Sequence, residues 1–307
     1  MEIVGIGYVG FECTVVDAWR DYGPNVMALM PVTPPDSDPA SLYLKMDERR
    51  YRVAFHPGAI DRMSYVGWEA RGRLEFLDAV AKFEAAGVAI EHGDAALAAT
   101  RGVRELIRFK DPAGFQHELF YGQKYEPGSY VPPRPHTGFN THERGMGHIV
   151  LMSPTYTDEL EHFLTKVMGF AWYGSGAGKG RTGFFRCKLN TQTSHDIAYG
   201  HAPGRRGIQH MGLHVKSIRD VGQTYDIVRK RELPMMFTLG QHIQDPHLSF
   251  YHYTPSGFAI ETIYEVSAWA PELFEANPER LSSWGHELVG PIIGPSVKTL
   301  EEIGEAA

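Results

Sequence analysis

Histidine and carboxylate side chains in the second half of the chain are the residues best suited to chemistry. The 307 residues include 15 histidines, and histidine is the commonest metal ligand and the usual acid–base residue near neutral pH. Three candidates are His148, His210 and Glu261. Two imidazoles and one carboxylate form the triad that binds non-haem Fe(II) and leaves coordination positions open. A lone histidine is more often structural, so the case depends on where these residues lie.

An internal repeat places the three candidates at related positions. The repeat pairs Tyr8 with His148, Tyr65 with His210 and Glu118 with Glu261, at separations of 140, 145 and 143 residues. The clearest match is Asp-Pro-Ala-Gly-Phe-Gln-His-Glu ending at 118 against Thr-Pro-Ser-Gly-Phe-Ala-Ile-Glu ending at 261. Matches at nearly one offset indicate two homologous halves. Since tyrosines replace both histidines in the first half, we expect the metal only in the second and a structural role for Glu118.

The elements that must position these residues form an α+β pattern. Each half contains two units of about 55–65 residues, in which a strand and a helix precede further strands. Helical spacing is found at 74–86, 158–167 and 218–230, and the opening unit has only a short segment at 15–22. Strands cluster after each helix instead of alternating with helices, which favours curved, barrel-like, mostly antiparallel sheets over a doubly wound sheet. We therefore predict two homologous domains, each a pair of βαβββ modules.

The domain boundaries follow from the repeat and from a Pro/Gly-rich stretch at 127–140, which is typical of a linker. We expect an N-terminal domain without metal at 1–130 and a linker at 131–144. A C-terminal metal-binding domain is expected at 145–290, followed by a tail at 291–307.

Composition excludes several classes of protein. Apolar residues make up 43% and charged residues 22% of the chain, as in soluble globular proteins. A net charge of −7 argues against a nucleic-acid partner, because phosphate binding needs a basic face. No apolar run is long enough to span a membrane, and the first residues lack the features of a signal peptide. Two cysteines fit a reducing compartment, so we expect a cytoplasmic protein.

The segment at 240–261 carries the most specific resemblance to a known family. It holds a glycine, a nearby histidine, an apolar residue with a tyrosine, Pro-x-Gly and a terminal glutamate, as Gly240, His242, Tyr251, Pro255-Ser256-Gly257 and Glu261. In these features the chain resembles the type I extradiol dioxygenases of the vicinal oxygen chelate superfamily, especially those that act on 2,3-dihydroxybiphenyl. The resemblance covers nearly the whole chain. It implies paired βαβββ modules and a metal in the C-terminal domain.

The resemblance also implies roles for individual residues. His195 matches the active-site histidine of the family and would take a proton from the catechol, for which a neutral imidazole is a suitable base. His242 and Tyr251 match residues that hydrogen-bond the substrate oxygens, and a phenol can donate to an oxyanion. Asp245 could orient His242. Val150, two residues past His148 on the same strand face, and Phe184 are candidate pocket walls.

The activity implied is cleavage of a 3-substituted catechol, alkyl or aryl, beside its two hydroxyls with both atoms of O2. The cofactor would be Fe(II), with Mn(II) as the alternative that the same ligands could hold. Family members form homo-oligomers, so one is expected here. Two other functions remain open: a metal-dependent isomerase or lyase of the same superfamily, and a non-enzymatic small-molecule binding protein. The glycine-rich segment 174–181 has no assigned role.

Overall fold

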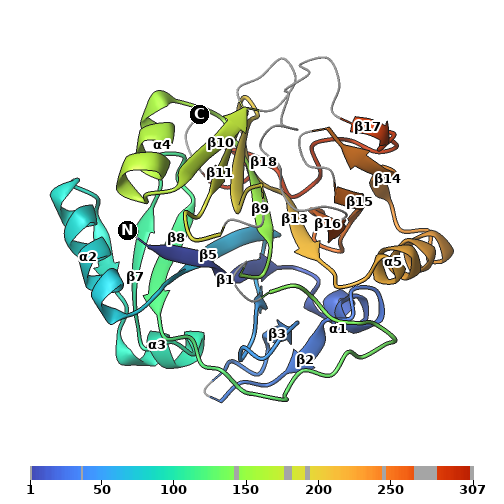
Figure 1. Cartoon of the computed structure of the whole chain (residues 1–307), viewed down its shortest axis with the longest axis horizontal. Coiled ribbons are helices and arrows are strands. Elements are labelled where there is room, and N and C mark those ends of the chain that lie inside the picture. The colour runs from blue at the N-terminus through green and yellow to red at the C-terminus, as the bar shows by residue number, and fades with distance from the viewer. Residues whose placement is uncertain are drawn as a thin grey trace.

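Two curved β-sheets with helices on their outer faces make up the computed structural model (Figure 1). The structure describes residues 2–35, 37–141, 145–175, 182–190, 194–243, 247–265 and 282–304. Asp245 and most of the glycine-rich segment 174–181 therefore lie outside the described residues.

The first sheet has eight strands in the order β2-β3-β4-β1-β5-β8-β7-β6. Its strands are β1 (Ile3–Cys13), β2 (Met30–Val32), β3 (Leu42–Lys45), β4 (Val53–Pro57), β5 (Arg62–Ala70), β6 (Ile90–His92), β7 (Glu105–Lys110) and β8 (Gln116–Tyr121). The central strands β1 and β5 are antiparallel, and each has a parallel neighbour on its other side, β4 and β8 respectively.

The second sheet repeats this plan in the order β10-β11-β12-β9-β13-β16-β15-β14-β17, with β18 paired to β13. Its strands are β9 (His148–Ser153), β10 (Ala171–Ser175), β11 (Thr182–Arg186), β12 (Ile197–His201), β13 (Arg205–His214), β14 (Met235–His242), β15 (His247–Tyr253), β16 (Ala259–Glu265), β17 (Ser282–Gly285) and β18 (Lys298–Thr299). Strands β9 and β13 are antiparallel and carry parallel neighbours β12 and β16. The predicted α+β class and the related, mostly antiparallel sheets are confirmed. Neither sheet closes into a barrel, since each strand order ends on an edge strand.

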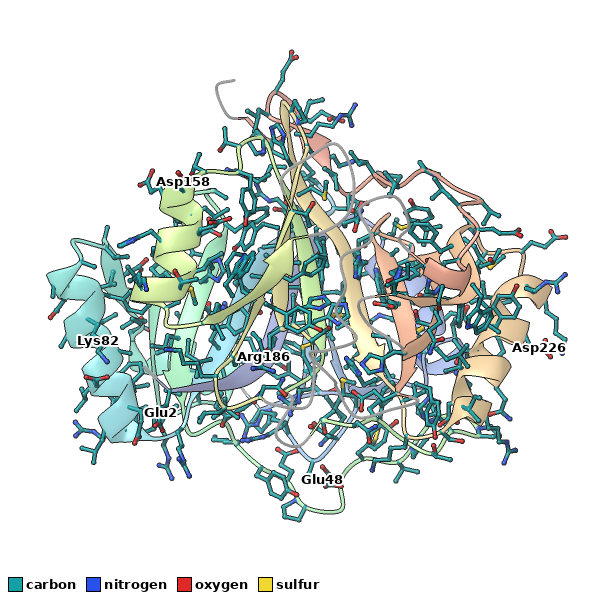
Figure 2. The ribbon with its side chains drawn as sticks, turned by 45° about the horizontal axis from the view of Figure 1, so that its top comes forward. Glu2, Glu48, Lys82, Asp158, Arg186 and Asp226 are labelled. Atoms are coloured by element: carbon teal, nitrogen blue, oxygen red, sulfur yellow. The ribbon has the colours of Figure 1, made fainter. Side chains whose placement is uncertain are left out.

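Capping residues mark the ends of several helices. The helices are α1 (Val16–Asn25), α2 (Arg73–Ala85), α3 (Ala95–Arg101), α4 (Asp158–His162) with a π-helical turn η1 (Phe163–Val167), and α5 (Ile218–Lys230). Ser217 caps α5 by accepting the amide hydrogen of Arg219, and Asp94 caps α3 by accepting that of Leu97. Helix α3 ends at Gly102, whose φ of 67° suits glycine. Charged side chains such as Lys82, Asp158 and Asp226 lie on the outer faces of the helices (Figure 2).

The two halves share one hydrophobic core. Phe11 of β1 stacks on Phe258, which precedes β16, with ring centroids 4.6 Å apart. Helices from different halves lie side by side in Figure 1, α1 next to α5 and α2 next to α4. An ion pair joins Arg231, after α5, to Asp21 of α1 at 2.6 Å. No helix in the described part of the chain is long and apolar enough to cross a membrane.

Candidate metal centre and substrate cavity

Three neighbouring strands bring His148, His210 and Glu261 together around one glycine. His148 opens β9, His210 lies in β13 and Glu261 lies in β16. Gly212 of β13 pairs with His148 on one side and with Glu261 on the other. A Cβ atom on Gly212 would lie 2.2 Å from the His148 ring. The missing side chain therefore leaves the space that the His148 imidazole occupies.

The three side chains point their polar atoms at one another inside the protein. Nε2 of His148 lies 3.2 Å from Nε2 of His210 and 3.2 Å from a carboxylate oxygen of Glu261. Nε2 of His210 lies 3.7 Å from the same oxygen. All three side chains are buried, and among the described residues they are the group whose ligand atoms converge as a metal site requires.

Electrostatics favours the protonation states that a metal needs. Burial and the neighbouring His148 lower the pKa of His210 to about 3, so its imidazole is neutral. Burial alone would raise the pKa of Glu261, but the hydrogen bond from His148 and the electrostatic influence of the surrounding histidines bring this pKa well below its usual value. A neutral imidazole and an ionised carboxylate are the forms that bind a cation. The donor set thus fits a divalent transition metal such as Fe(II) or Mn(II).

Gln209 orients His210 through a hydrogen bond. The sequence did not indicate this contact. The side-chain oxygen of Gln209 lies 3.0 Å from Nδ1 of His210. A carboxamide oxygen only accepts, so Nδ1 carries the hydrogen and Nε2 is left with its lone pair toward Glu261. The amide nitrogen of Gln209 donates to the main-chain oxygen of Ile292 at 2.9 Å. Such an outer contact fixes the tautomer and direction of a metal-binding histidine.

In the first half, an arginine lies beside Glu118, the residue that corresponds to Glu261. Arg101 donates to both oxygens of Glu118 at 2.9 Å, and its guanidinium lies 3.7 Å from the centroid of the Tyr65 ring. Tyr8 donates to Glu118 at 2.7 Å. Arg101, and not a metal ion, thus supplies the positive charge beside Glu118, which fits a structural role for this glutamate.

A cavity of about 300 Å³ opens beside the three convergent residues. Its walls include five of the six other residues predicted for the site, namely His195, His242, Tyr251, Val150 and Phe184. The sixth, Asp245, lies outside the described residues. Further apolar walls come from Met152, Met236, Phe237, Ile292 and Ile293. The volume and the apolar lining suit a small aromatic molecule.

His195 lies in the cavity wall between His148 and Phe184. Its ring centroid is 4.2 Å from that of His148 and 4.9 Å from that of Phe184, which meets it edge-on. Nδ1 of His195 lies 2.8 Å from the Ser194 hydroxyl. The imidazole is therefore held against His148 and borders the space that a ligand would fill.

Tyr251 and His242 form a hydrogen-bonded pair in the cavity wall, next to His210. The Tyr251 hydroxyl lies 2.8 Å from Nε2 of His242, and its ring meets that of His210 edge-on at 5.1 Å. Behind this pair lie Ser282 and His286, with the His286 ring 4.2 Å from that of His242. Sequence reasoning missed both, because Ser282 and His286 come after the matched motif and no pattern distinguishes them.

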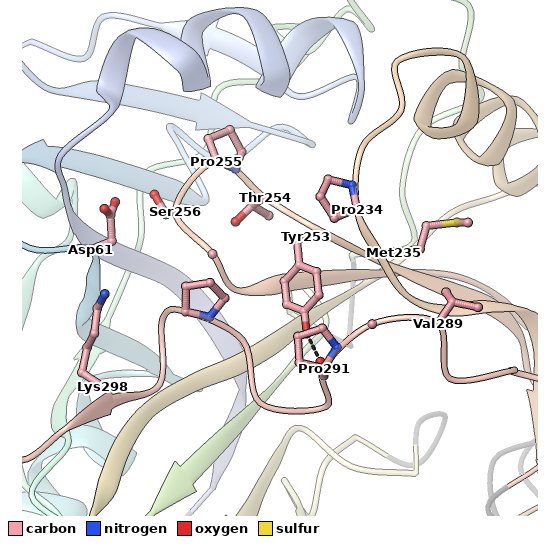
Figure 3. Close-up of a pocket in the computed structure, with 13 residues that line it drawn as sticks. Asp61, Pro234, Met235, Tyr253, Thr254, Pro255, Ser256, Val289, Pro291 and Lys298 are labelled. Carbon is pink, nitrogen blue, oxygen red and sulfur yellow. Dashed lines mark hydrogen bonds between the residues drawn. The ribbon is translucent and has the colours of Figure 1, made fainter.

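A second, larger hollow of about 720 Å³ is lined by a separate set of residues (Figure 3). Tyr253 crosses it, and its hydroxyl donates to the main-chain oxygen of Pro291, so the C-terminal segment is tied to β15. The Pro-Ser-Gly turn at 255–257 also lines it. None of the predicted site residues does, so this hollow does not belong to the candidate centre.

The chain is similar to known dioxygenases over most of its length. Residues 6–58 match the family model described as dihydroxybiphenyl dioxygenase BphC D1. The chain is 36% identical over 300 residues to an iron-dependent extradiol dioxygenase of Rhodococcus jostii (strain RHA1), covering 94% of this chain and 98% of that protein. It is 32% identical over 299 residues to a biphenyl-2,3-diol 1,2-dioxygenase of Paraburkholderia xenovorans (strain LB400), covering 94% and 97%. The crystal structure of BphC, a halotolerant catechol dioxygenase, superposes with a TM-score of 0.88 at 31% identity, covering 97% of this chain and 99% of that one.

Proposed function

The chain belongs to the extradiol dioxygenases, and we propose that it cleaves a 3-substituted catechol with an Fe(II) ion held by His148, His210 and Glu261. Enzymes of this family open a catechol ring beside its hydroxyl groups with O2. The observation that carries the proposal is the convergence of these three side chains beside an apolar cavity, which His210 and Glu261 line. The bound metal would supply Lewis acidity and bring catechol and O2 together.

The side chains around the metal position have distinct tasks in this proposal. His195 borders the cavity next to His148 and takes a proton from the incoming catechol, so that the catechol binds as an anion. Tyr251, hydrogen-bonded to His242, contacts a substrate oxygen from its place next to His210. The buried walls exclude water from the reacting groups.

The cavity walls support an apolar substituent on the substrate ring. Phe184, Met236, Phe237 and Ile293 offer hydrocarbon surface, and 2,3-dihydroxybiphenyl is a compound of suitable shape and polarity. A carboxylate-bearing catechol would place a charge against these walls, which is unfavourable. We therefore propose aryl- or alkyl-substituted catechols as substrates, in the breakdown of aromatic compounds.

An oxygen-uptake assay tests the proposed function. Protein loaded anaerobically with Fe(II), and in parallel with Mn(II), is given catechols that carry methyl, phenyl, fused-ring or carboxylate groups, followed by O2. We expect one O2 consumed per catechol, a yellow ring-fission product and a preference for the apolar substituents. Metal-loaded protein that consumes no O2 with any catechol would refute the proposal. Substrate conversion without O2 uptake would indicate an isomerase or lyase instead.

We further propose that the protein forms a homo-oligomer. Trp284 of β17 is half exposed, and Leu288 and Val289, which follow this edge strand, are about equally exposed. Exposed apolar side chains near a strand edge are suited to contact with another copy. Analytical ultracentrifugation should give a mass that is a multiple of 34.4 kDa, and a monomer at micromolar concentration would contradict the proposal.

A further inference from the structure

A chain of hydrogen bonds leads from the cavity to the backbone of β15. The Tyr251 hydroxyl lies 2.8 Å from Nε2 of His242, and Nδ1 of His242 lies 3.4 Å from the Ser282 hydroxyl. That hydroxyl lies 3.2 Å from Nδ1 of His286. The chain ends at Ser249, where Nε2 of His286 lies 3.0 Å from the main-chain oxygen and 3.1 Å from the side-chain hydroxyl.

The last contact fixes the direction of every other one. A main-chain oxygen only accepts, so Nε2 of His286 carries the hydrogen, and in a neutral ring Nδ1 is then an acceptor. The single hydrogen of Ser282 therefore points to His286, which makes the Ser282 oxygen the acceptor for Nδ1–H of His242. In neutral His242 the remaining nitrogen, Nε2, accepts from the hydroxyl of Tyr251.

The surroundings of His286 support its role as the anchor. The residue is buried, and burial lowers its pKa to about 4, so the ring is neutral near pH 7. Its backbone has a φ of 48°, which is uncommon for residues other than glycine. Backbone conformations of this kind persist where the surrounding contacts require them. The imidazole is thus buried and neutral, and its backbone is held in an uncommon conformation by the surroundings.

We propose that His286, acting through Ser282, is a positioning residue that holds His242 in the tautomer with its hydrogen on Nδ1. In this arrangement the Tyr251 hydrogen is directed at His242, and the Tyr251 oxygen presents a lone pair to the cavity. Resting on the proposed function, this means that Tyr251 accepts a hydrogen bond from the hydroxyl that a singly ionised catechol retains. Tyr251 would thus recognise a neutral hydroxyl, in contrast to the donor role expected from the sequence.

The tautomer of His242 can be measured directly in the unmodified protein. Protein labelled with 15N-histidine and loaded with diamagnetic Zn(II) is studied by NMR, and the His242 signals are assigned by their loss in His242→Gln. The proposal predicts a protonated Nδ1 and an unprotonated Nε2. A hydrogen on Nε2 would overturn it, whatever the catalytic activity of the protein.

Variants of Ser282 test whether the anchor matters for turnover. In Ser282→Ala we expect unchanged metal content, a mixture of His242 tautomers and a kcat/KM about tenfold lower, the effect of one hydrogen bond. Ser282→Thr keeps the hydroxyl and should restore both the tautomer and kcat/KM. Ser283→Ala is the matched control, since Ser283 is exposed and its hydroxyl bonds to the main-chain oxygen of Gln241.

The outcomes separate this inference from the proposed function. If the wild-type protein cleaves catechols but Ser282→Ala keeps both full kcat/KM and the Nδ1 tautomer, the inference is wrong and the proposed function stands. If Ser282→Thr is as impaired as Ser282→Ala, the serine only fills space and the inference is again wrong. If no catechol is cleaved, the proposed function fails, and the NMR signals of His242 still decide the tautomer.

Discussion

At the scale of single residues, the metal-binding candidates depend on neighbours that do not themselves face the metal position. Gln209 binds Nδ1 of His210 through its oxygen and the C-terminal segment through its nitrogen. The Gln209 side chain therefore links His210 to Ile292, which lines the cavity. A change at Gln209 should act first on metal affinity.

We predict that Gln209→Leu weakens metal binding by about 10- to 100-fold, since loss of such an outer contact typically has that effect. Gln209→Glu keeps an acceptor oxygen for Nδ1 of His210 and should bind metal better than the leucine variant. Competition with a fluorescent chelator measures the affinity. Equal affinities of Gln209→Leu and the wild type would show that His210 needs no such partner.

His195→Ala should separate metal binding from turnover. The imidazole contacts His148 but is not among the convergent ligand atoms, so metal content should remain near that of the wild type. Loss of a general base should lower kcat by about 10²- to 10⁴-fold. His162→Ala, on the exposed side of α4, is the control and should retain activity. If His195→Ala loses its metal, the residue has a different role.

Residue types and the internal repeat led to the three candidates, and the resemblance to the extradiol dioxygenases led to His195, His242 and Tyr251, which line the cavity. The repeat aligns Tyr8 with His148 and Tyr65 with His210, which showed that histidines stand in the second half where the first half has tyrosines. Gln209, Ser282 and His286 could not be predicted in this way. Their roles depend on which side chains the folded strands bring within hydrogen-bonding distance, and neither spacing nor residue type reveals that.

At the scale of elements, the strand register places the two sites at equivalent points. Gly67 of β5 pairs with Tyr8 and Glu118, as Gly212 of β13 pairs with His148 and Glu261. A Cβ on Gly67 would lie 2.3 Å from the Tyr8 ring, close to the 2.2 Å at Gly212. Both glycines thus leave room for a large ring on the adjacent strand.

The two glycines provide a matched pair of variants. Gly212→Ala should displace the His148 ring and lower metal occupancy, whereas Gly67→Ala should leave occupancy unchanged. Overpacking should cost about 1–3 kcal/mol of folding free energy at either position. Metal content per chain and urea unfolding of the metal-loaded protein measure the two effects. Equal metal loss in both variants would contradict the assignment of the site to β9, β13 and β16.

Periodicity predicted the helices to within a few residues where an apolar stripe was clear. The helix expected at 218–230 is α5, with Val221, Thr224 and Val228 on its buried face. The stretch at 158–167 instead divides into α4 and the π-helical turn η1. The first helix continues to Asn25 although it contains Pro24. Pro24 has no amide hydrogen to donate to the carbonyl four residues earlier, and the helix ends one residue after it.

At the scale of the whole molecule, the sheets of the two halves are joined through buried polar contacts as well as apolar ones. Tyr22 of α1 and His252 of β15 share a hydrogen bond of 2.7 Å between the hydroxyl and Nε2. The indole nitrogen of Trp19 donates to the hydroxyl of Ser256 at 2.9 Å. The first half therefore supports the strands that carry Tyr251 and Glu261, although it holds no metal candidates among its described residues.

This interface predicts a loss of stability in acid. Burial lowers the pKa of His252 to about 3, while a histidine in an unfolded chain titrates near pH ~6.5. The stability due to neutral His252 is complete above pH ~6.5 and is lost as the pH falls toward 3, because the unfolded chain binds the proton more readily. Between pH 7 and 5 the loss should be about 2 kcal/mol.

His252→Gln removes the titrating group and keeps a polar partner for Tyr22. We expect the free energy of urea unfolding to fall less between pH 7 and 5 in this variant than in the wild type, by about the same 2 kcal/mol. Comparison of the two proteins cancels the effect of other groups that titrate in this range. An equal decline in both would show that His252 is not protonated on unfolding.

The central claim is that the second half binds the metal and the first half does not, and the metal content of two matched variants tests it most directly. Glu261→Gln and Glu118→Gln change related residues in the same way, and each keeps hydrogen-bonding capacity. Both are purified alongside the wild type, and iron and manganese per chain are measured by mass spectrometry. We predict about one metal ion per chain in the wild type and in Glu118→Gln, and far less in Glu261→Gln. Retention of metal in Glu261→Gln with its loss in Glu118→Gln would contradict the account.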